Sequence, residues 1–348
     1  MNLPKRYSKN ENVIIWAIDP SQDPSEAKNL IKELRTWARH LNCEIQPVSV
    51  FSKSVLSLTK KLPIPWEGNA DKFAREAVGL YLKQTQCTEF LPPKIIFAST
   101  LSNRKMASVL AKHAESENAL MIFAYTRAKK TWNPFRLGGF AETLVATSRV
   151  PVLLLNPSAR PSSKISSILF PTEFSHESKN ALLNLAPLAK NFDSQVLIYS
   201  QIENFPLYPM PISFNGTVPP MMDIASTLRQ VEESRTKKAQ RWVHLLEGQG
   251  IDCSHLIRRQ RKNLSADILD IANKNKVNLI AMASLSGPVS QALLGGVARD
   301  LLLEAKCPVL IFHKTKVAKM RPATQKQFAN KRTQGKKQSS LYSGHQHL

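Results

Sequence analysis

The sequence has no long hydrophobic run, few glycines and no closely spaced cysteines. No uninterrupted apolar stretch in its 348 residues approaches the roughly 18 that a membrane-spanning helix needs. The opening residues, MNLPKRYSKNENV, include no apolar segment, so we expect no secretory signal. The four cysteines, Cys43, Cys87, Cys253 and Cys307, have no C-x-x-C spacing. This favours reduced, mostly buried thiols in a cytoplasmic protein over a disulfide framework or a zinc site.

Acidic residues are also scarce. The chain has 26 Asp and Glu against 48 Lys and Arg, which gives a net charge of +22. Much of this excess lies in residues 314–348, where nine basic side chains occur without an acid. A segment this polar cannot offset its ordering entropy by packing, so we expect a disordered tail. It is either a solvated extension or an arm for nucleic acid or an anionic surface. Its candidate contact residues are Lys314, Lys316, Lys319, Arg321, Lys326, Lys331, Arg332, Lys336 and Lys337.

Between the termini, strand-like and helix-like segments alternate, which predicts parallel sheets covered by helices. Asn12–Asp19 is a continuous apolar run, as in a strand buried on both faces, and Ser25–His40 has helical spacing. Pro157–Lys164 is rich in Pro and Ser and has no periodicity, as is typical of a linker. We therefore expect a first domain over 1–156, the linker over 157–164, a second domain over 165–313 and the tail over 314–348.

The two halves end alike. RLGGFAETLVATSRVPVLLLNP closes the first and LLGGVARDLLLEAKCPVLIFHK the second, which indicates an internal duplication. Val150–Asn156 and Cys307–His313 are the last strands of their halves, and both are apolar and uncharged through the middle. Such strands are hazardous as exposed sheet edges, so we expect them to pair with each other across a pseudo-twofold axis.

The second half resembles the universal stress protein family. Its segments ILFPTEFSHESKNAL, SADILDIANKNKVNLIAMAS and LLGGVARDLL are similar to the first strand and helix, the third helix and fourth strand, and the last helix of that family. The first half is more divergent but matches at its two ends, NVIIWAIDPSQDPSEAKNLI and LGGFAETLVATSRVPVLLL. The resemblance implies two doubly wound, Rossmann-like five-stranded parallel-sheet domains in tandem. It also implies that they form an intramolecular pseudo-dimer, with further homo-oligomers left open.

In one branch of the family, ATP lies at the carboxyl ends of the strands. The resemblance implies an acid after the first strand, a glycine-rich loop after the fourth, and glycines at the start of the last helix, where free N–H groups favour phosphate. The matching acids are Asp19 and Glu173. The matching loop and helix positions are Gly138, Gly139, Ala283, Ser286, Gly287, Gly295 and Gly296.

This sequence departs from the nucleotide motif in both halves. Ala283 and Ser286 stand where the first two glycines are expected, and a Cβ at a position that requires positive φ costs about 1 kcal/mol. In the first half the loop has no early glycine, and Tyr125 occupies space that a nucleotide would need. Cations of that loop, Arg127, Lys129 and Lys130, either hold a phosphate as point charges or belong to a solvated loop. The glycine pairs serve either phosphate or close packing.

No catalytic set is recognisable, because no serine lies in a nucleophile elbow with His and Asp partners. The sequence therefore predicts a non-catalytic stress-response or regulatory protein that acts through its folded surface, with no cofactor expected. A nucleotide-binding stress protein, with low-affinity ATP and slow hydrolysis, is the alternative. A nucleic-acid-associated protein that binds through its basic tail is the second alternative.

Overall fold

The apolar runs form strands and the periodic segments form helices. The computed structural model describes residues 12–53, 70–87, 89–100, 102–126, 139–157, 159, 161–162, 164–203, 224–284 and 295–313. Its first half contains β1 (Val13–Ala17), α1 (Lys28–Leu41), β2 (Glu44–Ser52), α3 (Ala70–Gln84), β3 (Lys94–Ala98), α4 (Asn103–Ser116), β4 (Met121–Tyr125), α5 (Gly139–Thr147) and β5 (Val152–Leu155). Its second half contains β6 (Ser167–Pro171), α6 (His176–Phe192), β7 (Gln195–Ile202), α7 (Ile224–Glu247), β8 (Cys253–Arg259), α8 (Leu264–Lys274), β9 (Leu279–Ala283), α9 (Gly296–Glu304) and β10 (Val309–Phe312).

Local side-chain chemistry sets several helix boundaries. The Ser175 hydroxyl caps α6 by accepting the Ser178 N–H at 3.1 Å, and the Asn263 side chain caps α8 by accepting the Ala266 N–H at 2.9 Å. Helix α1 begins at Lys28, later than the expected Ser25. The reason is that the residues before it form turns, in which the Asp23 carboxylate accepts the Ser25 N–H at 2.8 Å.

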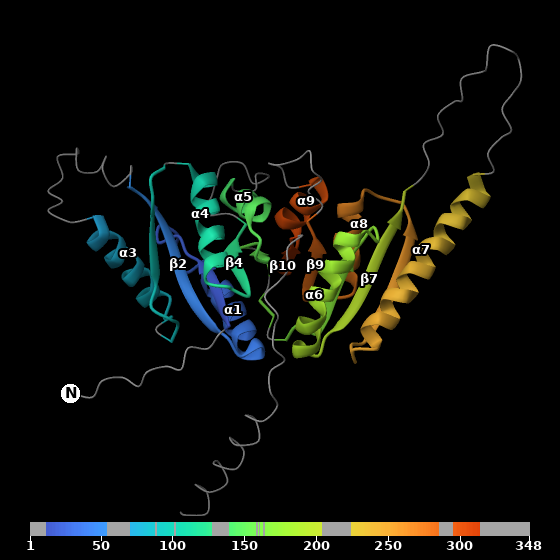
Figure 1. The fold of residues 1–348 in the computed structure, drawn as a ribbon, viewed down its shortest axis with the longest axis horizontal. Coiled ribbons are helices and arrows are strands. Elements are labelled where there is room, and N and C mark those ends of the chain that lie inside the picture. Colours follow the sequence, from blue (N-terminus) through green and yellow to red (C-terminus); the bar gives the residue numbers. More distant parts are fainter. Residues whose placement is uncertain are drawn as a thin grey trace, which may run out of the picture.

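All the strands belong to one sheet with the order β3-β2-β1-β4-β5-β10-β9-β6-β7-β8. Within each half the neighbouring strands are parallel and the order is that of a doubly wound fold. The two predicted five-stranded parallel sheets are therefore present as two blocks of a single ten-stranded sheet (Figure 1).

The blocks meet through β5 and β10, which pair antiparallel with Leu153 opposite Leu310. The prediction that the two closing strands pair with each other is confirmed. Further contacts cross the junction: the Asn156 amide donates to the Leu303 carbonyl at 2.5 Å, and Arg299 lies 3.7 Å from Glu142. The edges of the sheet are then β3 at one end and β8 at the other.

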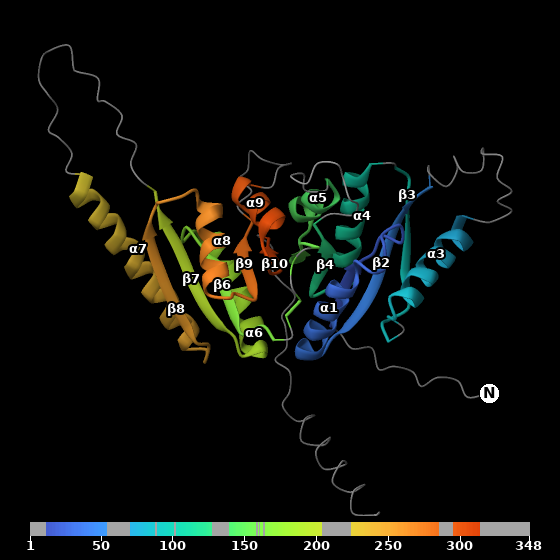
Figure 2. The same ribbon diagram turned by 180° about the vertical axis from the view of Figure 1, so that it is seen from behind.

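Two apolar layers lie on opposite faces of the sheet, and each runs through both halves. One contains the inward faces of α1, α3, α6 and α7, and the other those of α4, α5, α8 and α9. Both views show the helices of each layer following one another along the sheet, from α3 at one end to α7 at the other (Figures 1 and 2). Within the described ranges, none of the helices is long and apolar enough to cross a membrane.

Candidate functional site

The strand order reverses twice, between β1 and β4 and between β6 and β9. In doubly wound sheets, ligands bind outside the carboxyl ends of the strands at such a switch point. Asp19 follows β1 and Tyr125 ends β4, so both lie at the first switch point. Glu173 follows β6 and Ala283 ends β9, at the second. The glycines that begin α5 and α9 lie at the same edge of the sheet, because each helix follows the fourth strand of its half.

In the first half, Tyr125 spans the switch point. Its hydroxyl donates to the backbone carbonyl of Glu26, just before α1, at 2.5 Å. The side chain therefore runs from β4 across the end of β1. Burial raises the pKa of the Tyr125 hydroxyl, and it also raises that of the neighbouring Tyr81 on α3, with smaller contributions from Tyr125 and Asp19. Both phenols are therefore protonated at neutral pH, and Tyr125 is a donor.

The carboxylate of Asp19 shapes the turn that leads to α1. Its Oδ1 accepts the Ser21 N–H at 3.0 Å and the Ser21 hydroxyl at 2.6 Å. The Asp19 carbonyl also accepts the Gln22 N–H at 3.0 Å. This is an Asx-type turn, in which one carboxylate oxygen is already used by the chain itself.

In the second half, the exposed Glu173 bonds to the start of α6. Its Oε1 accepts the hydroxyl of the buried Ser178 at 2.9 Å. The next residue, Phe174, has a left-handed backbone with φ of 63°, and its N–H donates to the Thr172 hydroxyl at 2.9 Å. The Phe174 ring packs edge-on against Trp242 of α7, with centroids 5.0 Å apart. The loop after β6 is thus a packed turn and helix cap.

Tyr125 and Ala283 occupy the same place in the two halves, at the ends of β4 and β9. We expected strain from a Cβ at this position, but neither residue has a positive φ. The backbone there is extended strand, which any residue adopts. The two side chains therefore differ in the space that they fill and not in backbone strain: a buried methyl group at Ala283, and a phenol ring at Tyr125.

The helix-start glycines are open in the described structure. Gly295 caps α9 with φ of −57°, so its backbone does not require glycine. A Cβ added at Gly139, Gly295 or Gly296 would meet no described atom within 4 Å. Close packing, one of the two expected reasons for these glycines, is therefore not seen among the described neighbours. The remaining candidates, Gly138, Arg127, Lys129, Lys130, Ser286, Gly287 and the basic residues of 314–348, lie outside the described residues.

Two features at the strand ends were not predicted from the sequence. Thr126 and Ser284 directly follow β4 and β9, and their N–H groups donate to the carbonyls of Leu155 and Phe312 at 3.0 and 2.8 Å. The hydroxyl of Thr126 is buried and has no hydrogen-bond partner among the described atoms. Thr126 and Ser284 therefore occupy equivalent positions in the two halves. In the sequence, the dipeptides Tyr-Thr and Ala-Ser at the ends of the two fourth strands indicate this correspondence.

A buried polar network is the second feature. Asp267, in the first turn of α8, accepts the hydroxyl of Tyr199 and, at 3.2 Å, the side-chain amide of Gln201. Arg258 lies 3.8 Å from the other carboxylate oxygen. The side chains that contact the Asp267 carboxylate come from β7 and β8, so the network fixes α8 on the sheet.

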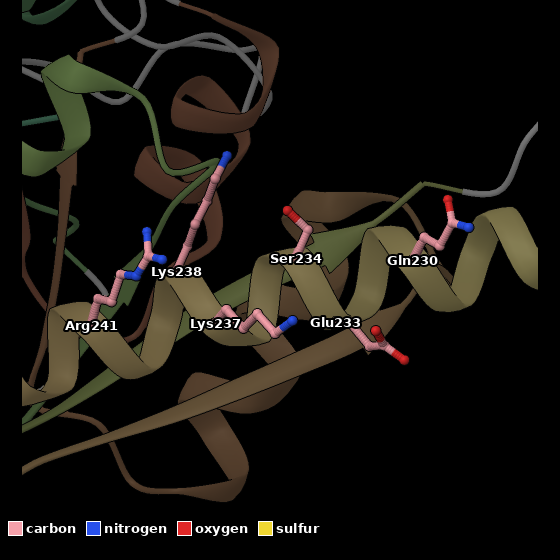
Figure 3. A pocket seen from close by; sticks show the side chains of 6 residues that line it. All are labelled: Gln230, Glu233, Ser234, Lys237, Lys238 and Arg241. Carbon is pink, nitrogen blue, oxygen red and sulfur yellow. The ribbon is translucent and has the colours of Figure 1, made fainter.

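The outward face of α7 carries a hollow of about 330 Å³ (Figure 3). The six side chains that line it are Gln230, Glu233, Ser234, Lys237, Lys238 and Arg241. All belong to one helix and are polar or charged. Because α7 packs on β7 and β8, its outward face lies away from both switch points. We interpret it as a solvated helix face.

The comparisons with known proteins agree with this architecture. Residues 164–313 match the model of the universal stress protein family. A universal stress protein of Methanocaldococcus jannaschii is 26% identical over 157 residues, which cover 43% of this chain and 82% of that protein.

Solved structures match over nearly the whole length. A functionally unknown protein from Pseudomonas aeruginosa PAO1 is similar with a TM-score of 0.57 and 12% identity, over 86% of this chain and 92% of that one. A universal stress protein from Archaeoglobus fulgidus DSM 4304 is similar with a TM-score of 0.55 and 14% identity, over 88% and 100%. At such identities the likeness concerns the fold. The match to the universal stress protein family covers the second half, residues 164–313, and the likeness of the whole chain to the solved structures is one of fold.

Proposed function

We propose that this protein is a non-catalytic stress-response protein that acts through its folded surface on a partner, and not through a bound nucleotide. The observation that carries the proposal is the hydrogen bond between the Tyr125 hydroxyl and the Glu26 carbonyl, which closes the first switch point. The division into two domains at residues 157–164 and a cytoplasmic location are parts of the same proposal. The location is proposed from the four free and mostly buried cysteines, which fit a reducing compartment.

A ligand at the first switch point must displace the Tyr125 ring and break its hydrogen bond. Moving the half-buried Tyr125 ring into solvent costs at most about 1.5–3 kcal/mol, and the loss of its hydrogen bond to the exposed Glu26 adds about 1 kcal/mol or less. A penalty of this size weakens binding by at most about a hundredfold to a thousandfold. At the second switch point, Oε1 of Glu173 already accepts the Ser178 hydroxyl, which ties this carboxylate to the start of α6.

A calorimetric titration of the purified chain with ATP tests the proposal. We expect no low-micromolar binding, and at millimolar ATP a stabilisation well below about 2 kcal/mol. Weak association through surface cations should fade as salt is raised and should not distinguish ATP from GTP. A tight, adenine-selective and salt-insensitive dissociation constant would overturn the proposal.

The second candidate function is nucleotide binding at the second switch point. Two features favour it: the side chain of Ala283 is small, and the space around Gly295 and Gly296 is open. These glycines lie at the N-terminus of α9, where free backbone N–H groups can bind an anion. Gly296→Val should abolish any ATP signal that arises there. The matched variant Gly139→Val, at the equivalent helix of the first half, should leave that signal unchanged.

Nucleic-acid binding through residues 314–348 is a further proposal, supported by their charge. Its test is the salt dependence of RNA and DNA retention with and without that segment.

A further inference from the structure

Helix α1 carries a row of cations on its outward face. Lys28, Lys32, Arg35 and Arg39 follow one another at helical spacing, and all four are exposed. The opposite face of α1 is apolar and buried, including Leu30, Leu34 and Trp37. We propose that this row, the α1 stripe, is a contact surface for the phosphate backbone of a double-stranded nucleic acid. The inference rests on the proposed function in that it names a partner for the folded surface.

The charges of the stripe are largely available. Arg35 donates to the Glu89 carboxylate at 2.7 Å and to the Gln86 carbonyl at 2.8 Å, so its guanidinium is committed to the protein. In contrast, no ion pair within the described part of the chain involves Lys28, Lys32 or Arg39. These three cations are the ones that we assign to phosphate.

The placement of the lysines opposes the helix dipole. Acidic residues are favourable in a first turn and cations are unfavourable there. Helices α6 and α8 follow this rule with Glu177 and Asp267, whereas α1, like α4, α7 and α9, has no acid in its first turn, and it begins with Lys28. Helix stability therefore does not account for Lys28, and the positive end of the helix dipole adds to its attraction for an anion.

Helix α6 lies beside α1. Phe192 of α6 packs edge-on against Trp37, with centroids 4.9 Å apart, and stacks on His40 of α1 at 4.8 Å. The two helices therefore lie together on one face of the sheet, near its centre (Figures 1 and 2). Exposed Lys179 and Lys190 lie on α6, and the latter donates to the Gln249 carbonyl at 3.0 Å.

The chemistry of the stripe fits a duplex better than a single strand or a membrane. Single-stranded nucleic acids are held by stacking on exposed aromatic rings, and membrane-surface helices insert apolar side chains. Among the described residues, the large hydrophobic side chains that are exposed are Leu80 and Leu183, and neither is aromatic or on α1. From Lys28 to Arg39 the helix axis extends about 16 Å, which matches several successive phosphates along one strand of a duplex.

The test compares two triple variants of the full chain in the binding of a fluorescent 20-base-pair duplex. One is Lys28→Gln/Lys32→Gln/Arg39→Gln. The matched control is Lys237→Gln/Lys238→Gln/Arg241→Gln, which removes the same charge from the outward face of α7 (Figure 3). Any contribution of residues 314–348 is equal in both. We expect the α1 variant to lose at least about tenfold in affinity, and the slope of log K against log salt to fall by about two to three.

The control variant should change affinity by less than about threefold. Equal losses in the two variants would overturn the proposal, because they would show a response to net charge alone. It would also be overturned if the α1 variant lost binding to phosphatidylserine vesicles, or to single-stranded RNA, but kept binding to the duplex. Unchanged melting temperatures would show that both variants are folded. These outcomes are independent of the ATP titration, so the two proposals fail separately.

Discussion

The buried carboxylate of Glu33 accepts the backbone N–H of Ser162 at 2.8 Å. Its other oxygen accepts the indole N–H of Trp37 at 3.1 Å. Glu33 belongs to α1 of the first half, and Ser162 lies in the segment that leads to β6. One fully buried acid therefore fastens the connection between the halves to the core of the first.

This arrangement predicts a pH dependence of stability. Burial, which outweighs the two hydrogen bonds, raises the pKa of Glu33 above its usual 4.5. Because the pKa of Glu33 is higher in the folded state than in the unfolded state, the folded protein is more stable when Glu33 is protonated. This contribution to stability is complete below about pH 4.5 and is lost as pH rises through the folded-state pKa. We expect the free energy of unfolding of the wild type, relative to Glu33→Gln, to decrease between pH 4 and pH 7.

Denaturant titrations at each pH measure this difference. The amide of Glu33→Gln turns an N–H group toward one of the two donors, so that variant should be destabilised by about 1–3 kcal/mol at low pH. The control is Glu304→Gln, at an exposed carboxylate of α9, whose stability relative to wild type should not change over this range. A pH-independent gap between the wild type and Glu33→Gln would contradict the prediction.

The contact between Trp37 and Phe192 should couple the two halves energetically. These rings lie edge to face, both are almost fully buried, and they come from α1 and α6. We expect Phe192→Leu and Trp37→Leu each to be destabilising. Their double-mutant cycle should give a coupling of about 0.5–1.5 kcal/mol, as for other aromatic pairs. Thermal unfolding should show one transition. Two separate transitions would mean that the halves unfold independently, and a coupling near zero would mean that this ring contact does not link them.

Tyr125 provides a direct test of the closed switch point. Tyr125→Phe keeps the ring and loses the bond to Glu26, which should lower stability by about 1 kcal/mol. Tyr125→Ala also removes the half-buried ring and should lower it by about a further 1–3 kcal/mol. If the ring blocks the site, only the alanine variant should gain ATP-dependent stabilisation in a thermal shift assay. A gain in both variants would assign the block to the hydrogen bond, and a gain in neither would show that the ring is not the barrier.

Periodicity predicted parallel sheets covered by helices, and the family resemblance supplied the doubly wound, five-stranded arrangement of each half. The bounds of the strands agree with those of the apolar runs to within a few residues. The apolar middles of the last strands correctly predicted the pairing of β5 with β10. What the sequence did not reveal is that one apolar layer on each face of the sheet runs through both halves. That continuity depends on contacts between residues more than a hundred positions apart, such as Asn156 and Leu303, for which no local pattern exists.

The candidate site was harder to predict than the fold. A motif shows which residue types stand at a strand end, and so it led to Asp19, Glu173 and Ala283. It does not show what their side chains already bind. The bonds from Ser21 to Asp19 and from Ser178 to Glu173 follow from turn and cap geometry. The network around Asp267 joins three elements of the second half, and its members have no common spacing in the sequence.

The cysteines should be unreactive in the folded protein. Burial raises the pKa of Cys43, Cys253 and Cys307 to about 12, and raises that of Cys87. The expected mostly buried thiols are confirmed: three are buried and Cys43 is partly exposed. Since the thiolate is the reactive form, a pKa near 12 leaves only about one thiol in ten thousand ionised at pH 8.

An aromatic disulfide reagent at pH 8 measures this reactivity. We expect all four thiols to react on the timescale of unfolding, and at once in guanidinium. Cys43→Ser should leave the rate in native buffer unchanged, because partial exposure without ionisation does not produce a nucleophile. A thiol that reacts in native buffer as fast as free cysteine would contradict the prediction. If Cys43→Ser abolished that fast reaction, the partly exposed thiol of α1's C-terminal turn would be identified as a reactive group.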